Sequence, residues 1–398
     1  MVGAGISGLG AGYLLAPAHE VEVFERAQQP GGHTRTFHHR GLALDMGFLV
    51  HNERNYPLLR RLFRELGVAT QASEMSFSVS CGCGLEYSGR RPFAQPRRLV
   101  DPRFHGLLWE ISRWLRTARR SLERFDCESW SLGRYLDERG FSAGFRRHFI
   151  VPLTSALWST APGRALEFPA AYAIRFFENH GMLGLGRFRW RYVTGGSERY
   201  VHALAARLGR RIHRGLGVRV LRRIADGVEL TTEDGESRRF DAAVVATHAD
   251  QALALLADPS REERRVLGAF SYTANEVILH TDASFLPRSP AARASWNYRV
   301  RDARRPTITY YLNRLQRLDA DRDYCVTLNE HVAPEHVIER TVMEHPLYTL
   351  ESLAAQRELA SLSGRRRTYY AGAHHGNGFH EDGLASGVRV AAALGVDW

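Results

Sequence analysis

The sequence lacks lysine and any long apolar run. All 54 of its Lys-plus-Arg side chains are arginine, which excludes a P-loop lysine, a Schiff-base lysine and attachment of pyridoxal phosphate. No stretch approaches the ~20 apolar residues of a membrane-spanning helix, and no charged-then-apolar signal precedes the first predicted strand. We therefore expect a cytoplasmic protein.

Cysteine is also scarce, with 4 in 398 residues, which is too few for a disulfide framework. Cys81-Gly-Cys83 is not accompanied by a second pair of ligands in the sequence. Cys127 and Cys325 are isolated. The sequence therefore predicts free thiols and no metal site.

The net charge of +11 is strongly positive. The composition is otherwise ordinary, with 44% hydrophobic and 24% charged residues. A coding bias toward arginine produces the same excess, and no nucleic-acid recognition motif accompanies it. We expect no nucleic-acid partner. The length allows two domains and a sizeable core.

The most informative stretch is the first one, where Gly3, Gly5 and Gly8 form G-x-G-x-x-G between a strand and a helix. The first glycine suits a tight turn, the second lets the backbone approach a pyrophosphate, and the third lets helix and strand pack closely. Glu25 follows about 20 positions later, where a carboxylate suits a ribose hydroxyl and repels a 2′-phosphate. The pattern predicts a dinucleotide and makes NADP the least favoured one. Because such strands usually run ~5 residues or more, we expect the natural start to lie upstream of Met1.

Further glycines extend this motif, namely Gly31-Gly32-His33-Thr34 and then Asp45-x-Gly47. Together with Glu25-Arg26, they resemble the flavin amine oxidase and phytoene desaturase superfamily. The resemblance implies FAD as the cofactor. The cofactor-binding residues that it implies are Gly3, Gly5, Ile6, Ser7, Gly8, Glu25, Arg26, Gly31, Gly32, His33, Thr34, Gly47, Phe48, Val218, Gly372, Gly378, Asp382, Gly383 and Leu384.

The flavin motifs fall in three separate parts of the chain. This order implies an α/β (mixed α+β) fold: a discontinuous Rossmann-like FAD-binding domain with an inserted substrate domain of mixed sheet plus helices. We predict that residues 1–60, 195–265 and 365–398 form the FAD-binding domain. Residues 61–194 and 266–364 would form the substrate domain.

Further runs, such as Gly378-Phe-His-Glu-Asp-Gly and Ser295-Trp-Asn-Tyr, resemble one bacterial branch of that superfamily. Its members are usually labelled only as predicted NAD/FAD-binding or amine-oxidase-like proteins. Their genes often lie beside those of cyclopropane-fatty-acyl-phospholipid synthase-like methyltransferases. The resemblance implies an FAD-dependent oxidoreductase, and it favours a lipid or fatty-acyl substrate with a lipid methyltransferase as a partner.

Two alternatives to a lipid oxidoreductase stay open. One is oxidation of a small amine, which the superfamily typically assists with a lysine that this chain lacks. The other is a flavin-binding helper of a lipid methyltransferase without turnover of its own.

A basic helix is predicted from Phe104 to Phe125, with an apolar stripe, Trp109 and Trp114, and arginines on the other side. Such a helix could dock on the anionic inner face of a membrane. The alternative, which we favour, is a solvated helix that packs its apolar stripe inward.

Catalysis would require a base or proton relay within hydrogen-bond reach of the substrate. His380 and Glu381, next to the last flavin motif, are the first candidates, and His51 and His180 are the second. For each of these histidines taken singly, we favour a structural role.

Overall fold

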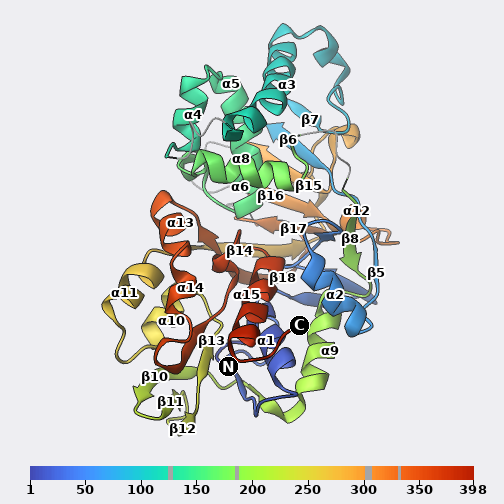
Figure 1. Cartoon of the computed structure of the whole chain (residues 1–398). Helices are drawn as coiled ribbons and strands as arrows, with labels where there is room; N and C mark the ends of the chain where they lie inside the picture. The colour runs from blue at the N-terminus through green and yellow to red at the C-terminus, as the bar shows by residue number, and fades with distance from the viewer. Residues whose placement is uncertain (124–128, 184–187, 301–306, 330–332) are drawn as a thin grey trace.

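The structure is a computed structural model that describes residues 1–123, 129–183, 188–300, 307–329 and 333–398. Cys127 therefore lies outside the described residues. The α/β class expected from the sequence is confirmed. In Figure 1 the lower part holds both termini and the short parallel strands, and the upper part holds a larger mixed sheet under a group of helices.

Short parallel strands form the centre of the lower part. Their spatial order is β9 (Ile212–Arg214), β1 (Val23–Glu25), Val2, β13 (Ala243–Val245) and β19 (Thr368–Tyr370). Val2 forms parallel bridges to Phe24 on one side and Val245 on the other. The first residues thus connect strands from three distant parts of the chain.

The first and last long helices, α1 (Ile6–Leu15) and α15 (His380–Ala393), cross closely at glycines. A β-carbon on Gly10 would lie 2.6 Å from Leu384 Cδ1, and one on Gly387 would lie 2.6 Å from the Ser7 carbonyl oxygen. Larger side chains would separate the helices. This close crossing brings the first glycine motif beside the last one.

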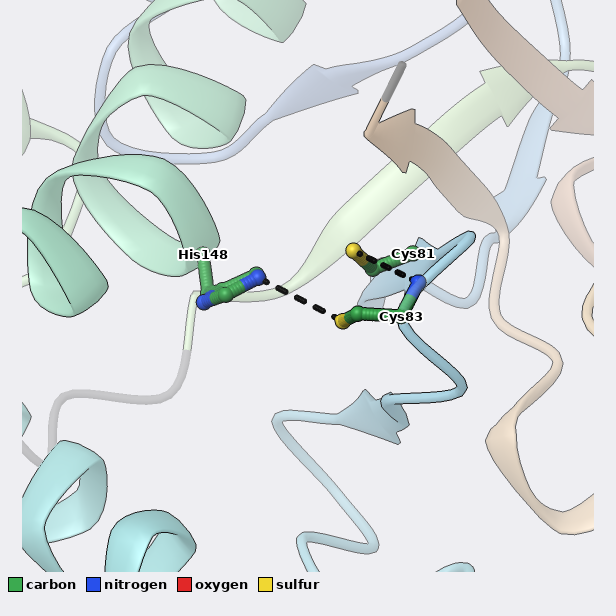
Figure 2. A group of neighbouring side chains, drawn as sticks. All are labelled: Cys81, Cys83 and His148. Carbon is green, nitrogen blue, oxygen red and sulfur yellow. Dashed lines mark hydrogen bonds between the residues drawn. The ribbon is translucent and has the colours of Figure 1, made fainter. Parts of the chain in front are cut away.

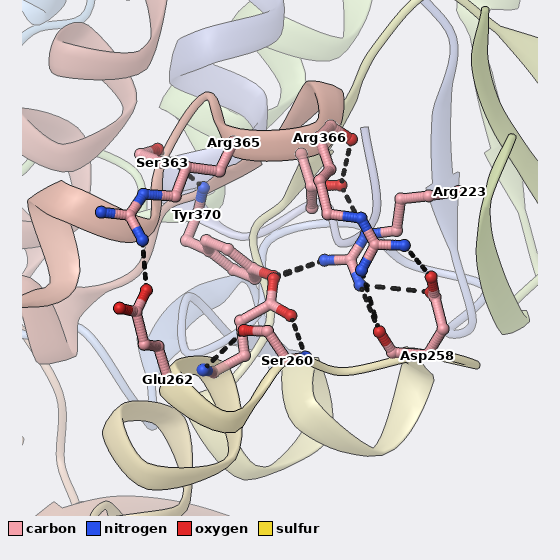
Figure 3. A network of polar contacts seen from close by, with 10 residues as sticks. Arg223, Asp258, Ser260, Glu262, Ser363, Arg365, Arg366 and Tyr370 are labelled. Carbon is pink, nitrogen blue, oxygen red and sulfur yellow. Dashed lines mark hydrogen bonds and ion pairs between the residues drawn. The ribbon is translucent and has the colours of Figure 1, made fainter. Parts of the chain in front are cut away.

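A second sheet in the lower part is the antiparallel β10 (Val218–Ile224), β11 (Gly227–Thr232) and β12 (Ser237–Phe240). Helices α10 (Ala249–Leu255) and α11 (Arg261–Gly268) follow it. A buried polar network ties β10 to α11 and β19 (Figure 3). In it, Arg223 Nη2 lies 2.5 Å from Glu263 Oε1, and the Tyr370 hydroxyl donates to the same carboxylate at 2.6 Å.

The upper part is built on one seven-stranded sheet. Its order is β18 (Val337–Leu347), β14 (Ser271–His280), β17 (Cys325–Leu328), β16 (Thr307–Tyr311), β15 (Trp296–Val300), β6 (Phe77–Cys81) and β7 (Glu86–Ser88). Only the β15–β6 pair is parallel among the pairings described for this sheet. The sheet thereby joins strands from both predicted segments of the substrate domain.

Helices cover this sheet at the top of Figure 1. They are α3 (Pro102–Glu123), α4 (Leu132–Glu138), α5 (Ala143–Phe145), α6 (Val151–Trp158), α7 (Pro162–Ala165) and α8 (Ala170–Asn179). In α3, Trp114 is fully buried and Trp109 is 59% exposed. The helix thus packs its stripe inward, as favoured, and presents one tryptophan to solvent.

The remaining elements connect these parts. The strands are β2 (Thr36–His39), β3 (Leu42–Asp45), β4 (His51–Asn52), β5 (Thr70–Ala72) and β8 (Trp190–Val193). The helices are α2 (Pro57–Glu65), α9 (Glu198–Leu208), α12 (Leu312–Leu315), α13 (Leu350–Gln356) and α14 (Leu359–Leu362). Short helical turns are η1 (Pro96–Val100), η2 (Arg146–Ile150), η3 (Gly209–Arg211), η4 (Ala283–Phe285), η5 (Pro290–Ala292), η6 (Arg365–Arg367) and η7 (Ala373–His375). Among the described residues, no helix combines the length and apolarity needed to cross a membrane.

Candidate active site

The first glycine motif forms the turn between Val2 and α1. Gly3 has φ +98°, and a β-carbon there would lie 2.8 Å from the Ala246 carbonyl oxygen. A β-carbon on Gly8 would lie 2.0 Å from the Gly3 carbonyl oxygen. Gly5, at the helix N-terminus, has no atom within 4 Å of its β-carbon position. Gly3 and Gly8 therefore permit the turn. Gly5 leaves a free space at the helix N-terminus, where backbone N–H groups attract a phosphate.

Glu25 ends β1 beside this space. Its carboxylate accepts hydrogen bonds from the Ala4 N–H at 2.8 Å and the Ala27 N–H at 2.9 Å. Arg26 pairs with Glu233, with 2.7 Å between Nε and Oε1. The backbone thus orients Glu25 toward the position that a ribose would occupy beyond the glycine turn.

The second glycine pair packs against the first motif. The Gly31 N–H donates to the Ala4 carbonyl at 2.8 Å. A β-carbon on Gly47 would lie 1.8 Å from the His33 carbonyl oxygen. The predicted motifs are therefore interlocked by backbone contacts that tolerate no side chain.

A single cavity of about 1040 Å³ runs along these motifs and into the upper part. Its volume lies at the upper end of the range for ligand pockets. Most predicted cofactor-binding residues line it: Gly3, Gly5, Ile6, Ser7, Glu25, Arg26, Gly31, Gly32, His33, Gly47, Phe48, Val218, Gly372 and Gly378. An open helix N-terminus, an oriented carboxylate and a long cavity fit a dinucleotide such as FAD.

The other predicted cofactor residues lie behind the cavity wall: Gly8, Thr34, Asp382, Gly383 and Leu384. They shape the site through packing. A β-carbon on Gly383 would lie 2.9 Å from Ser7 Oγ, and the Asp382 carboxylate accepts the Phe379 N–H at 3.0 Å. Burial raises the pKa of Asp382.

His380, the first catalytic candidate, lines the cavity. Its ring stacks on Phe48 with 4.0 Å between centroids, and Nε2 lies 2.9 Å from Thr34 Oγ1. Burial lowers the pKa of His380 to about 3. The imidazole is therefore neutral at neutral pH, where it is a weak base that can orient a neighbour.

Glu381 points away from the cavity and caps another helix. Its two carboxylate oxygens accept the N–H groups of Leu58 at 2.8 Å and Leu59 at 2.9 Å, in the first turn of α2. Burial raises the pKa of Glu381. Both oxygens are engaged with a helix N-terminus, so this carboxylate stabilises α2 in the structure.

Of the two second-rank candidates, His180 lines the cavity and His51 does not. His180 lines the cavity, donates from Nδ1 to the Phe176 carbonyl at 3.0 Å, and stacks on the Phe176 ring. His51 is not among the cavity-lining residues and packs edge-on against Phe63. Burial lowers the pKa of both His51 and His180 to about 4. His180, and not His51, is placed to meet a substrate.

Sequence reasoning missed a polar corner of the cavity made by His248, His345 and Glu344 around His33. His33 Nε2 donates to the Glu344 carbonyl at 2.7 Å, and His248 Nδ1 lies 3.3 Å from Glu344 Oε2. The Asn275 amide donates to His345 Nδ1 at 2.9 Å, which leaves Nε2 of His345 as the protonated nitrogen. Burial lowers the pKa of His345 to about 3.

One residue of this corner, His248, could have been identified from the sequence. His248 lies just beyond β13, after Ala246 and Thr247, and ligands bind beyond the carboxyl ends of parallel strands. Nothing comparable marks His345 in the sequence, because it lies near the end of a long antiparallel strand.

Comparison with known proteins agrees with this geometry. The sequence profile of the family described as flavin containing amine oxidoreductase matches residues 6–395. AofH of Mycobacterium tuberculosis strain H37Rv, whose name assigns it to the flavin-containing monoamine oxidases, is 29% identical over 257 residues. That match covers 60% of this chain and 54% of AofH, so the chain spans about half the length of the curated relatives it matches.

Similar solved structures share the fold over nearly the whole chain. Putrescine oxidase with bound putrescine has a TM-score of 0.73 at 15% identity, covering 99% of this chain and 97% of that one. Cyclohexylamine oxidase from Brevibacterium oxydans IH-35A has a TM-score of 0.71 at 16% identity, covering 98% and 97%. A CLA-producing fatty acid isomerase from P. acnes has a TM-score of 0.70 at 17% identity, covering 99% and 97%.

Proposed function

Because the chain belongs to the flavin containing amine oxidoreductase family, and is thus an FAD-dependent oxidoreductase, we propose that its substrate is a lipid or fatty-acyl chain. The reaction would oxidise or desaturate that chain. Bound FAD would supply the hydride acceptor, its N5 atom. The protein's residues would bind the substrate, exclude water and orient the reacting carbon.

The observation that carries this proposal is the apolar lining of the cavity beyond the flavin motifs. The lining residues from the upper part are mainly large and apolar: Met75, Leu157, Trp158, Phe176, Met182, Trp190, Val277, Trp296, Leu328 and Met343. Removing apolar surface from water stabilises a complex by roughly 25 cal/mol per Å². An acyl chain would gain affinity along the whole of such a wall, whereas a short polar substrate would gain little.

The carboxylates of the cavity support the same choice. Among the described lining residues they are Glu25, Glu233 and Glu344. Each already contacts a lower-part partner: the Ala4 N–H, Arg26 and His248 respectively. The positive charge of an amine substrate would therefore have to be stabilised by the aromatic rings of the cavity wall. The fatty acid isomerase among the similar structures is a precedent for a fatty acid on this fold.

Within the site, we assign roles to the residues on the cavity wall. Glu25 would hold the ribose, and the N-terminus of α1 the pyrophosphate. His180 and His380, both neutral, would orient the substrate. The protonated Nε2 of His345 would offer a hydrogen bond from the polar corner.

Anaerobic flavin reduction tests the substrate class. Oleic acid or a phosphatidylglycerol extract should bleach the yellow FAD-loaded protein, and putrescine and cyclohexylamine should not. Reduction by an amine but not by a lipid would favour amine oxidation instead. A protein that binds no FAD, or whose flavin responds to neither class, would support the alternative of a non-catalytic helper of a lipid methyltransferase.

We further propose that the enzyme meets its substrate at an anionic membrane surface through what we call the η1–α3 surface. This surface carries four exposed apolar side chains: Phe93, Leu99, Val100 and Trp109, which are 39%, 57%, 84% and 59% exposed. His105 contacts the Phe93 ring and the Leu99 carbonyl. It also lies one helical turn before Trp109.

Arginines on the same two elements match an anionic lipid surface. Arg97 of η1 and both Arg103 and Arg116 of α3 are exposed, and the Arg113 guanidinium lies 5.2 Å from the Trp109 ring centroid. Apolar insertion and arginine–phosphate attraction act together at such interfaces. Location at the inner face of the membrane and partnership with a lipid methyltransferase remain part of this proposal.

Replacing both Val100 and Trp109 with aspartate should weaken vesicle binding strongly. Loss of two inserted side chains, at ~1.5–3 kcal/mol each, predicts binding at least about 100-fold weaker. Sedimentation with phosphatidylglycerol-containing vesicles measures it. Leu350→Asp, at a residue 46% exposed outside this surface, is the matched control. Equal binding to neutral phosphatidylcholine vesicles, or no effect of the double variant, would contradict the proposal.

A further inference from the structure

Three potential metal ligands converge at the edge of the seven-stranded sheet, and none of them is among the cavity-lining residues. Cys81 ends β6, Cys83 lies in the turn to β7, and His148 lies in η2, a π-helical turn. Their Sγ and imidazole nitrogen atoms all lie within 4.8 Å of one another. Figure 2 shows the thiols approaching from the hairpin and the imidazole from the helix. The fold thus adds a third ligand, 65 positions away, to the pair in the sequence.

Backbone contacts hold the two cysteines in this arrangement. The Cys81 N–H donates to the Leu85 carbonyl at 2.9 Å, and the Gly84 N–H donates to the Cys81 carbonyl at 2.8 Å. The Cys83 N–H points at Cys81 Sγ, 3.3 Å away. A thiolate at Cys81 would therefore already have a backbone donor.

The histidine is held from the other side. The Tyr87 hydroxyl donates to the His148 carbonyl at 2.7 Å, which ties η2 to β7. The imidazole Nε2 faces Cys83 Sγ at 3.7 Å. Single-turn π-helices also occur frequently at functional sites.

The sulfur–nitrogen distance suits a tetrahedral zinc ion. With Zn–S ≈ 2.3 Å and Zn–N ≈ 2.0–2.1 Å, a sulfur and a nitrogen on one zinc lie about 3.5 Å apart. The distance from Cys83 Sγ to His148 Nε2 is 3.7 Å. Cys83 is exposed and Cys81 is buried, so solvent can reach the fourth position while one ligand is anchored in the core.

We propose that Cys81, Cys83 and His148 bind one Zn²⁺ ion, with water as the fourth ligand. Binding converts both thiols to thiolates and releases their two protons to solvent, so the coordinated group carries no net charge. The ion would fasten the β6–β7 hairpin to η2 beneath the helical cover. Thiolate and imidazole ligands favour Zn²⁺ over Mg²⁺ or Ca²⁺, which prefer oxygen.

Metal analysis of the FAD-loaded protein tests this proposal. After treatment with chelator, incubation with Zn²⁺ and dialysis, wild type should retain about one zinc per chain. Cys83→Ser and His148→Ala should each retain almost none. His105→Ala, an exposed histidine on α3, should retain as much as wild type. FAD content and circular dichroism verify that each variant is folded.

Cobalt provides a second readout. Co²⁺ added to the metal-free protein should give thiolate charge-transfer absorption, together with d–d bands at longer wavelengths than the flavin. Both signals should disappear in Cys83→Ser. Zinc retention that is equal in wild type and Cys83→Ser, cobalt spectra without thiolate bands, or a stable Cys81–Cys83 disulfide in place of metal would each overturn the proposal.

Discussion

Gly5→Val is expected to give a folded protein that no longer retains FAD. The β-carbon position of Gly5 has no neighbour within 4 Å, and its φ of −74° and ψ of −177° are accessible to any residue. The β-carbon of the added side chain would therefore meet no protein atom within 4 Å. It would fill the space at the helix N-terminus that a pyrophosphate needs.

The expected loss follows from the hydrogen bonds that the phosphate would no longer make. Hydrogen bonds to a charged group contribute ~1.5–3 kcal/mol each, so losing one or two predicts FAD binding at least about 10- to 100-fold weaker. Fluorescence titration of the apoprotein with FAD measures the affinity. Thermal unfolding of the same apoprotein should match that of wild type.

Two other glycines in the same segment make the test specific. Gly12→Ala introduces a β-carbon with ordinary contacts of 3.5 Å to Val23, so it should retain FAD. Gly8→Ala places a β-carbon 2.0 Å from the Gly3 carbonyl oxygen, so it should destabilise the fold itself. Unchanged FAD affinity in Gly5→Val would place the pyrophosphate elsewhere.

The parts of the site that could be predicted from the sequence are those made by local backbone geometry. A β-carbon on Gly8 would lie 2.0 Å from the carbonyl oxygen of Gly3, which excludes any side chain at that position. The spacing of such glycines reflects a turn whose shape is set within a few residues. Glu25 was predictable for the same reason, because it ends the strand beside that turn.

Roles that depend on distant contacts could not be predicted in this way. Glu381 follows a flavin motif, yet its carboxylate reaches the first turn of α2, which begins more than 300 positions earlier in the chain. His345 enters the cavity because β18 crosses over the His33 loop, as the contact between His33 and the Glu344 carbonyl shows. The zinc ligand His148 comes from a helix that no sequence spacing connects with Cys81. Each depends on tertiary packing, which spacing along the chain does not encode.

Glu263→Gln is expected to destabilise the protein by about 3–5 kcal/mol, because it leaves a buried arginine without its closest charge. The side chains of Arg223 and Glu263 are only 3% and 6% exposed. Burial alone would raise the pKa of Glu263, but hydrogen bonds from Tyr370 and Ser260 and the charge of Arg223 hold it below its usual value. Urea unfolding of the FAD-loaded protein at pH 7 measures the difference.

Glu262→Gln is the matched control. Glu262 is the adjacent residue on α11 and pairs with Arg365, but the two side chains are 56% and 55% exposed. Exposed pairs contribute ~0–1 kcal/mol, so this variant should unfold nearly as wild type does. If the Glu262→Gln and Glu263→Gln proteins were equally stable, the buried contacts of Arg223, Glu263 and Tyr370 would not hold β10, α11 and β19 together.

The contribution of Glu263 to folding stability should decrease as the pH falls. A carboxylate with a lowered pKa in the folded state contributes stability above its unfolded pKa, and this contribution is lost as the pH falls through the folded value. For Glu263 the ordinary value is 4.5. The difference in free energy of unfolding between wild type and Glu263→Gln should thus have its full size at pH 7. It should shrink as the pH falls below 4.5. A difference that stays constant down to acid unfolding would assign the destabilisation to lost packing, not to the buried charge pair.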